Sequence, residues 1–93
     1  MQYEIFWSKK FKQDYQRLIK TANKAIVNEL LAVIENLAEG KTLAKKYQDH
    51  SLKGNWQGYR ECHIKPDVLL IYKLINNELI LTLVRVGSHS DLF

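Results

Sequence analysis

Three extended segments joined by two tight turns fill most of the C-terminal third of this 93-residue chain, and they restrict its fold more than any other feature. The segments span residues 59–65, 68–75 and 78–86 and are rich in branched and aromatic residues, as β-strands are. Pro66-Asp67 suits a tight turn, and Asn76-Asn77 supplies residues that tolerate left-handed backbone conformations. Strands connected this closely pair antiparallel. The sequence therefore predicts an antiparallel C-terminal meander.

Side-chain polarity indicates which faces of these strands are covered. In the first segment, Arg60, Cys62 and Ile64 alternate with Glu61, His63 and Lys65, so that one side can join a core while the other stays polar. The second segment is nearly all apolar apart from Lys73, as expected for a central strand covered on both faces. Cys62 falls on the inward side, where it is better explained as a small packed hydrophobe than as a nucleophile.

The N-terminal part predicts one strand followed by two helices. Residues 3–7 are typical of a strand, and Ser8 is placed to cap the helix that follows. Apolar residues then recur at helical spacing in two stretches, the second of which ends near Gly40. They are Phe11, Tyr15, Leu18 and Ile19 in the first stretch, and Ile26, Val27, Leu30, Val33, Ile34 and Leu37 in the second. We therefore expect a single α+β domain over residues 1–93, with both helices packed on one face of the sheet.

Composition restricts the class of protein and of partner. Hydrophobic residues make up 46% of the chain and charged residues 26%, a balance typical of globular rather than disordered proteins. The single cysteine has no disulfide partner, and we see neither a leader-like segment nor the roughly 20 apolar residues of a membrane span, so we expect a cytoplasmic protein. The formal net charge of +4 favours an anionic partner such as nucleic acid, although a solvated lysine face would give the same charge.

The predicted strand order brings polar groups together at one end of the sheet. The strand that carries His63 ends beside the start of the next strand, and that start lies beside the end of the last strand. The same sheet end should therefore hold His63, Asp67, Arg85 and the segment Gly87-Ser88-His89. His50 precedes these strands in an irregular polar segment, and we expect it to reach the cluster from a loop.

Histidines near a carboxylate can perform general acid and base catalysis, because imidazole takes up and releases protons near neutral pH. In RNA, a base removes the proton of a ribose 2′-hydroxyl, whose oxygen attacks the adjacent phosphorus while an acid protonates the departing 5′-oxygen. A cation such as Arg85 can stabilise the charge on the phosphate without a metal ion. These residues are suited to a proton-transfer site that needs no metal ion and no cofactor, and RNA cleavage is one reaction that such a site can perform.

Simpler explanations stay open for each residue. Surface histidines are common, an aspartate after proline often only stabilises its own turn, and Arg85 could pair with a carboxylate such as Glu61. Trp56 and Tyr59 could stack on bases or belong to the core. The histidines and Asp67 are also suitable zinc ligands, but no two of them have the close spacing of the usual zinc motifs, and we expect no metal site.

Spaced motifs in the second half of the chain match a known family. They are Asp49 to Trp56, Tyr59 to Asp67, Arg85 to His89, and the final Leu92-Phe93. Together they resemble the YafQ-type branch of the RelE toxin superfamily. The resemblance implies a RelE-like fold and the toxin half of a bacterial type II toxin–antitoxin pair. Such a toxin is an endoribonuclease, or mRNA interferase, that cuts mRNA in the ribosomal A site and is silenced by a bound antitoxin, which we expect to be small and acidic.

The resemblance also implies roles for individual residues. It places His50, His63, Asp67 and His89 on catalytic positions, Arg85 on a phosphate-binding position and Phe93 on that of a terminal aromatic that helps to hold the substrate. We also expect Lys53 and Lys65 to bind substrate. Glu61, beside His63 on the same predicted face, is a second-rank catalytic candidate that could orient a histidine or act as a base. We expect His89 to be the general acid and His50 or Asp67 the base. Val68 stands where some members carry tryptophan, so no base-stacking role is implied there.

Two other functions are compatible with this scaffold or composition. ParE-type toxins of the same superfamily inhibit DNA gyrase without cleaving RNA, and a basic RNA-binding module would need no catalysis. The histidine set favours cleavage, because inhibition by binding requires no residue that transfers protons.

Overall fold

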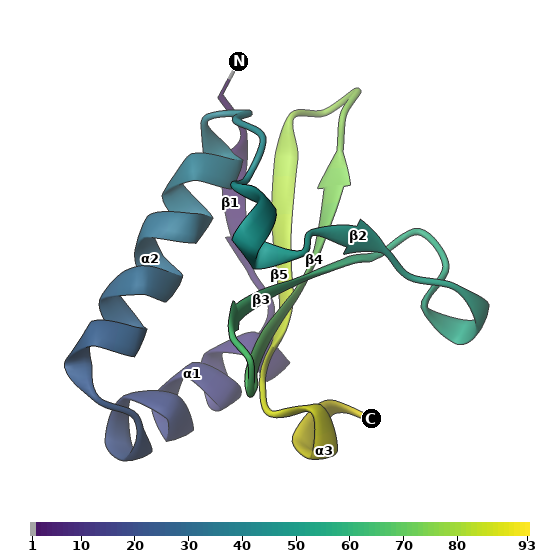
Figure 1. Ribbon diagram of the computed structural model, residues 1–93. Helices are drawn as coiled ribbons and strands as arrows, with labels where there is room; N and C mark the ends of the chain where they lie inside the picture. The colour runs from purple at the N-terminus through teal and green to yellow at the C-terminus, as the bar shows by residue number, and fades with distance from the viewer. Residues whose placement is uncertain (1) are drawn as a thin grey trace.

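Residues 2–93 are described by a computed structural model, in which a five-stranded sheet carries two helices on one face (Figure 1). The elements follow in the order β1 (Glu4–Trp7), α1 (Lys9–Thr21), α2 (Lys24–Ala38), the 3₁₀-helix η1 (Lys45–Tyr47), β2 (His50–Ser51), the 3₁₀-helix η2 (Gly54–Trp56), β3 (Arg60–Lys65), β4 (Val68–Ile75), β5 (Ile80–Gly87) and α3 (His89–Leu92). The strand order is β1-β5-β4-β3-β2, with β1 parallel to β5 and the other neighbours antiparallel. The predicted α+β fold is confirmed, including its antiparallel meander.

The boundaries of the two long helices follow from local hydrogen bonding. The Ser8 side chain accepts a hydrogen bond from the Phe11 backbone N–H at 3.1 Å, and Asn23 caps α2 in the same way. Such caps satisfy backbone donors that a helix leaves without partners in its first turn. After α2, Gly40 adopts a left-handed conformation with φ of 80°, which ends the helix. The predicted cap at Ser8 and stop at Gly40 are confirmed. No helix within residues 2–93 is long and apolar enough to cross a membrane.

An apolar cluster lies on each face of the sheet. The larger one, beneath α1 and α2, contains the fully buried Leu30 and Cys62, and burial raises the pKa of the Cys62 thiol to about 12. The inward position expected for Cys62 is thus confirmed. The smaller cluster lies on the opposite face, which the helices leave open, and contains Leu69, Ile71 and Leu92 of α3. This second cluster holds the C-terminal segment against the sheet.

The turn between β4 and β5 differs from the sequence prediction. We expected Asn76-Asn77 to supply the left-handed conformation and the last strand to begin at residue 78, but the left-handed residue is Leu79, with φ of 55°, and β5 begins at Ile80. The Leu79 carbonyl accepts a hydrogen bond from the Glu4 backbone N–H at 2.7 Å. This bond begins the pairing of β1 with β5. Because these strands are far apart in the chain, the local pattern of turn residues could not predict their pairing.

Candidate active site

Two rows of cross-strand neighbours connect the candidate residues on β3 with those on β5. One row joins Glu61, Ile71 and Arg85, and the next joins His63, Leu69 and Gly87. Paired residues on neighbouring antiparallel strands point to the same face, and Leu69 and Ile71 belong to the cluster on the open face. Because neighbouring strands lie about 4.8 Å apart, each row spans roughly 10 Å. His63 and the segment that leads into His89 therefore share one end of the open face, whereas Arg85, next to a register shift in the β4–β5 pairing, contacts Asp14 of α1.

Two histidines flank one buried carboxylate within this arrangement. His50 is the cross-strand partner of Glu61, and its Nε2 lies 3.4 Å from Glu61 Oε1. His63 Nε2 lies 3.6 Å from the same oxygen, whereas Glu61 is only 7% exposed. His50 Nδ1 is also 2.6 Å from the Gln48 carbonyl oxygen, which fixes the orientation of the ring. The expectation that His50 reaches the site from a loop is wrong, because pairing with β3 converts this segment into the short strand β2.

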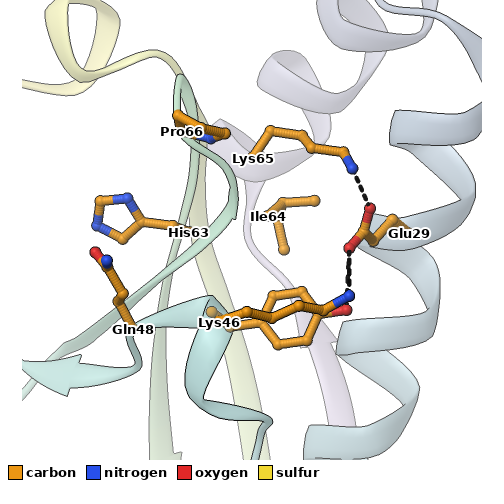
Figure 2. Close-up of a pocket in the computed structure, with 8 residues that line it drawn as sticks. Glu29, Lys46, Gln48, His63, Ile64, Lys65 and Pro66 are labelled. Atoms are coloured by element: carbon orange, nitrogen blue, oxygen red, sulfur yellow. Dashed lines mark hydrogen bonds and ion pairs between the residues drawn. The ribbon is translucent and has the colours of Figure 1, made fainter.

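A groove of about 350 Å³ adjoins His63 at the edge of β3, between η1 and α2 (Figure 2). Its far side carries Glu29, to which Lys65 pairs at 2.8 Å and Lys46 at 3.8 Å. The Tyr47 hydroxyl donates a hydrogen bond to the same carboxylate at 3.0 Å. The hydrogen bonds from Lys65 and Tyr47 lower the pKa of Glu29, and the bond to Glu29 raises the pKa of Lys65. Lys65, expected to contact substrate, is thus ion-paired to α2.

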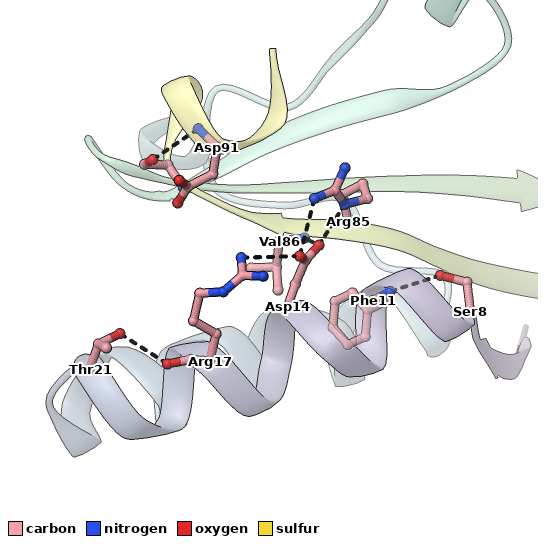
Figure 3. A network of polar contacts seen from close by, with 9 residues as sticks. Ser8, Phe11, Asp14, Arg17, Thr21, Arg85, Val86 and Asp91 are labelled. Carbon is pink, nitrogen blue, oxygen red and sulfur yellow. Dashed lines mark hydrogen bonds and ion pairs between the residues drawn. The ribbon is translucent and has the colours of Figure 1, made fainter.

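Arg85 pairs with Asp14 of α1, and the suggested pair with Glu61 does not form (Figure 3). Arg85 Nε donates to Asp14 Oδ2 at 2.7 Å, and one terminal nitrogen donates to Asp14 Oδ1 at 3.2 Å. The Val86 backbone N–H donates to Oδ2 at 3.2 Å, and Arg17 lies 3.6 Å from Oδ1. The hydrogen bond with Asp14 raises the pKa of Arg85. A two-point contact of this kind sets the orientation of the guanidinium plane.

Asp14 is the residue of this region that sequence reasoning missed. It is 3% exposed, although aspartate is rarely buried unless it is paired. Its position in the first helix could have indicated the burial. Asp14 lies three residues after Phe11 and one before Tyr15, so it falls within the apolar stripe rather than on the lysine-rich side. A charged residue inside such a stripe indicates a buried partner on the sheet.

The short helix α3, which the sequence did not predict, carries His89 and Phe93. Ser88 and Asp91 form a capping box at its start, and Leu92 is buried against the sheet. The ring centroids of His89 and Phe93 are 5.0 Å apart, and those of Phe93 and Trp56 are 5.7 Å apart. Trp56 therefore supports the terminal aromatic from η2. The half-exposed Phe93 and the exposed His89 remain open to solvent on this face.

The remaining candidates are exposed. Asp67 occupies the β3–β4 turn and lines a shallow cavity of about 210 Å³ together with Gly87 and Asp91, at the sheet end where β5 finishes. Within residues 2–93, no hydrogen bond or ion pair joins Asp67 to a histidine. Lys53 precedes η2 and faces solvent. Among the described residues, no group of three or more His, Cys, Asp or Glu side chains is arranged to hold a metal ion.

This arrangement offers two proton-transfer centres and an oriented cation. The pair His50 and His63 shares Glu61, and His89 stands separately on α3 beside Phe93. A carboxylate that contacts an imidazole can fix its orientation and stabilise its protonated form, which suits one histidine as a base and another as an acid. Arg85, two strands away from Glu61 in the same row, is the cation of this set. Imidazole, carboxylate and guanidinium groups together can serve phosphoryl transfer to an internal hydroxyl.

Comparisons with known proteins agree on one family. Residues 3–93 match the model of the family described as the bacterial toxin YafQ of a type II toxin–antitoxin system. The mRNA interferase toxin YafQ of Escherichia coli strain B is 35% identical over 96 residues, covering 100% of this chain and 98% of that protein. The crystal structure of a metal-bound toxin from Helicobacter pylori has a TM-score of 0.89 at 47% identity, with complete coverage of both chains. YafQ in the crystal structure of the E. coli DinJ–YafQ complex has a TM-score of 0.88 at 34% identity, with 99% of each chain covered.

Proposed function

Because the chain belongs to the YafQ family of bacterial toxins from type II toxin–antitoxin systems, we propose that it is the mRNA interferase of such a system. Its E. coli relative, which carries that name, matches over the full length of this chain. The observation that supports cleavage most directly is the pair of rows across the sheet, which bring Glu61, His63 and Arg85 to the sheet end where α3 begins.

The proposed reaction is attack of a ribose 2′-hydroxyl on the adjacent phosphorus. His50 or Asp67 removes the hydroxyl proton, and His89 protonates the departing 5′-oxygen. Glu61 orients His50 and His63 through its contacts at 3.4 and 3.6 Å. Arg85, held by Asp14, stabilises the negative charge that develops on the phosphate. The requirement for a 2′-hydroxyl selects RNA over DNA.

The proposed substrate is mRNA in the ribosomal A site, and the proposed partner is a small acidic antitoxin. The DinJ–YafQ complex is the precedent for such a partner in a relative. Lys53 and Phe93 are exposed on or near the open face and would contact the RNA. The formal charge of +4 supports both an RNA substrate and an acidic inhibitor, since each would be attracted to the same surface.

Mapping message ends after incubation with translating ribosomes tests this proposal. We expect cuts that leave 2′,3′-cyclic phosphate ends, and cleavage of free RNA that persists in EDTA, a control needed because ribosomes themselves require magnesium. His89→Ala should abolish cleavage and growth toxicity while changing the free energy of unfolding by less than about 0.5 kcal/mol, because His89 is exposed. Ser90→Ala, in the same turn of α3, serves as the matched control and should cleave normally.

Three outcomes would contradict the proposal. Gyrase-dependent DNA breaks without RNA cuts would indicate a ParE-like toxin. RNA binding without any cleavage would indicate a non-catalytic module. A folded His89→Ala variant that cleaves at the wild-type rate would remove His89 from the reaction.

A further inference from the structure

The groove beside His63 carries more positive charge than its own carboxylate neutralises. The ammonium groups of Lys46, from η1, and Lys65, from β3, both pair with the single carboxylate of Glu29. An ammonium group has three N–H donors, so each lysine retains donors beyond its contact with Glu29. The lysine side chains are 70% and 47% exposed, against 20% for Glu29. The groove therefore presents a net positive charge to solvent.

The same groove is continuous with the histidine cluster. His63 lines it on the side opposite Glu29, and Gln48 lies next to His63 along its wall (Figure 2). The Gln48 carbonyl is also the oxygen that contacts His50 Nδ1 at 2.6 Å. β2 pairs with β3 only at Arg60 and Glu61, so strand pairing ends before His63, which lines the groove. A nucleotide chain whose scissile phosphate lies at the histidines can pass directly over this edge of β3.

We propose that the groove is a subsite for a second RNA phosphate, bound between Lys46 and Lys65 on the chain that flanks the cleaved bond. The inference rests on the proposed function. In the free protein Glu29 accepts a hydrogen bond from Lys65 at 2.8 Å and attracts the ammonium group of Lys46 at 3.8 Å, which keeps both cations at the groove. Glu29 thus competes with the phosphate for the same two cations.

A purely structural role for the network makes a different prediction. Lys46, Lys65 and Tyr47 also join η1 and β3 to α2, and this tie supports the segment that leads to His50. If support were the only role, Glu29→Gln would loosen the segment and weaken RNA binding. If Glu29 competes with phosphate, Glu29→Gln frees the lysines and tightens RNA binding. The two interpretations predict opposite signs for one substitution.

The experiment measures the affinity for a fluorescent RNA with a 2′-O-methyl group at the scissile nucleotide, over a series of salt concentrations. Lys46→Met and Lys65→Met should each weaken binding about 3- to 10-fold and lower the salt slope by about one, as expected for the loss of one phosphate contact. Glu29→Gln should tighten binding by a similar factor at low salt. Lys41→Met and Glu39→Gln are the matched controls, because Lys41 pairs with Glu39 at 3.0 Å outside the groove. They carry the same changes in net charge and should stay within about twofold of wild type.

The outcomes separate this subsite from the proposed function. Groove variants that match the Lys41 and Glu39 controls, while the wild type cleaves RNA, would overturn the subsite and leave the function standing. Weaker RNA binding by a Glu29→Gln variant that melts normally would also overturn it. A wild-type protein that neither binds nor cleaves RNA would overturn both. Thermal melting of every variant excludes unfolding as the cause of a loss.

Discussion

Replacing Asp14 with alanine should destabilise the fold strongly, because Arg85 would keep its charge and lose its carboxylate. Removing one partner of a buried ion pair costs about 3–5 kcal/mol. The Arg85 side chain is 19% exposed and can recover some hydration, so we expect the lower end, about 3 kcal/mol, which includes the lost acceptor of the Val86 N–H. For a domain of this size, each kcal/mol shifts the melting temperature by about 4–8 °C. The melting temperature of Asp14→Ala should therefore fall by roughly 12–24 °C.

Urea unfolding followed by circular dichroism measures this loss, with an unchanged m-value as evidence that the unfolding transition is the same. Arg17→Ala is the matched control, because Arg17 contacts the same carboxylate at 3.6 Å but is 62% exposed. That exposed contact should contribute less than about 1 kcal/mol. A loss below about 1 kcal/mol for Asp14→Ala, or one no larger than that of Arg17→Ala, would refute the importance of the buried pair.

Three further predictions concern the open face and the core. Trp56→Ala removes the aromatic contacts with Tyr59 and Phe93 and should lower the free energy of unfolding by about 1–3 kcal/mol. Because Phe93 loses its support, RNA cleavage should also fall, and full cleavage by this variant would contradict the role assigned to Trp56. The Cys62 thiol should resist a thiol-specific reagent at pH 8 and react after denaturation, and rapid reaction of the native protein would argue against its burial. Since the pKa of this thiol is about 12 in the folded protein against an ordinary 9.0, folding should lose stability as the pH rises above 9.0.

Local pattern was enough to predict the sheet end where the candidate residues meet. Alternation in β3 and tight turns on both sides of β4 leave few possible registers, so His63 and Arg85 had to lie near the same end. The inward position of Cys62 follows from the same alternation. His50 was harder to place, because β2 has only two residues and depends on β3 for its pairing.

Interactions between the helices and the sheet could not be predicted in the same way. The contacts of Asp14 with Arg85 and of Glu29 with Lys65 join residues far apart in the chain, and they depend on how each helix rotates about its axis when it packs. Both glutamate and aspartate occur on helix surfaces, so composition alone does not distinguish a solvated carboxylate from a buried one. The pairing of Arg85 was therefore open until the packing was known.

Because the parallel pairing of β1 with β5 joins distant parts of the chain, we expect the site to assemble late in folding. This pairing joins Glu4 to Ile80, so nearly the whole chain must close into one loop before the pair forms, and contacts of such sequence separation slow folding. α1 follows β1 directly, and we expect its Asp14 to reach Arg85 together with this closure. A chain that has formed the meander alone holds Glu61 beside His63 but leaves the arginine without its carboxylate. We therefore expect the completed fold, rather than any single strand pair, to orient the guanidinium of Arg85.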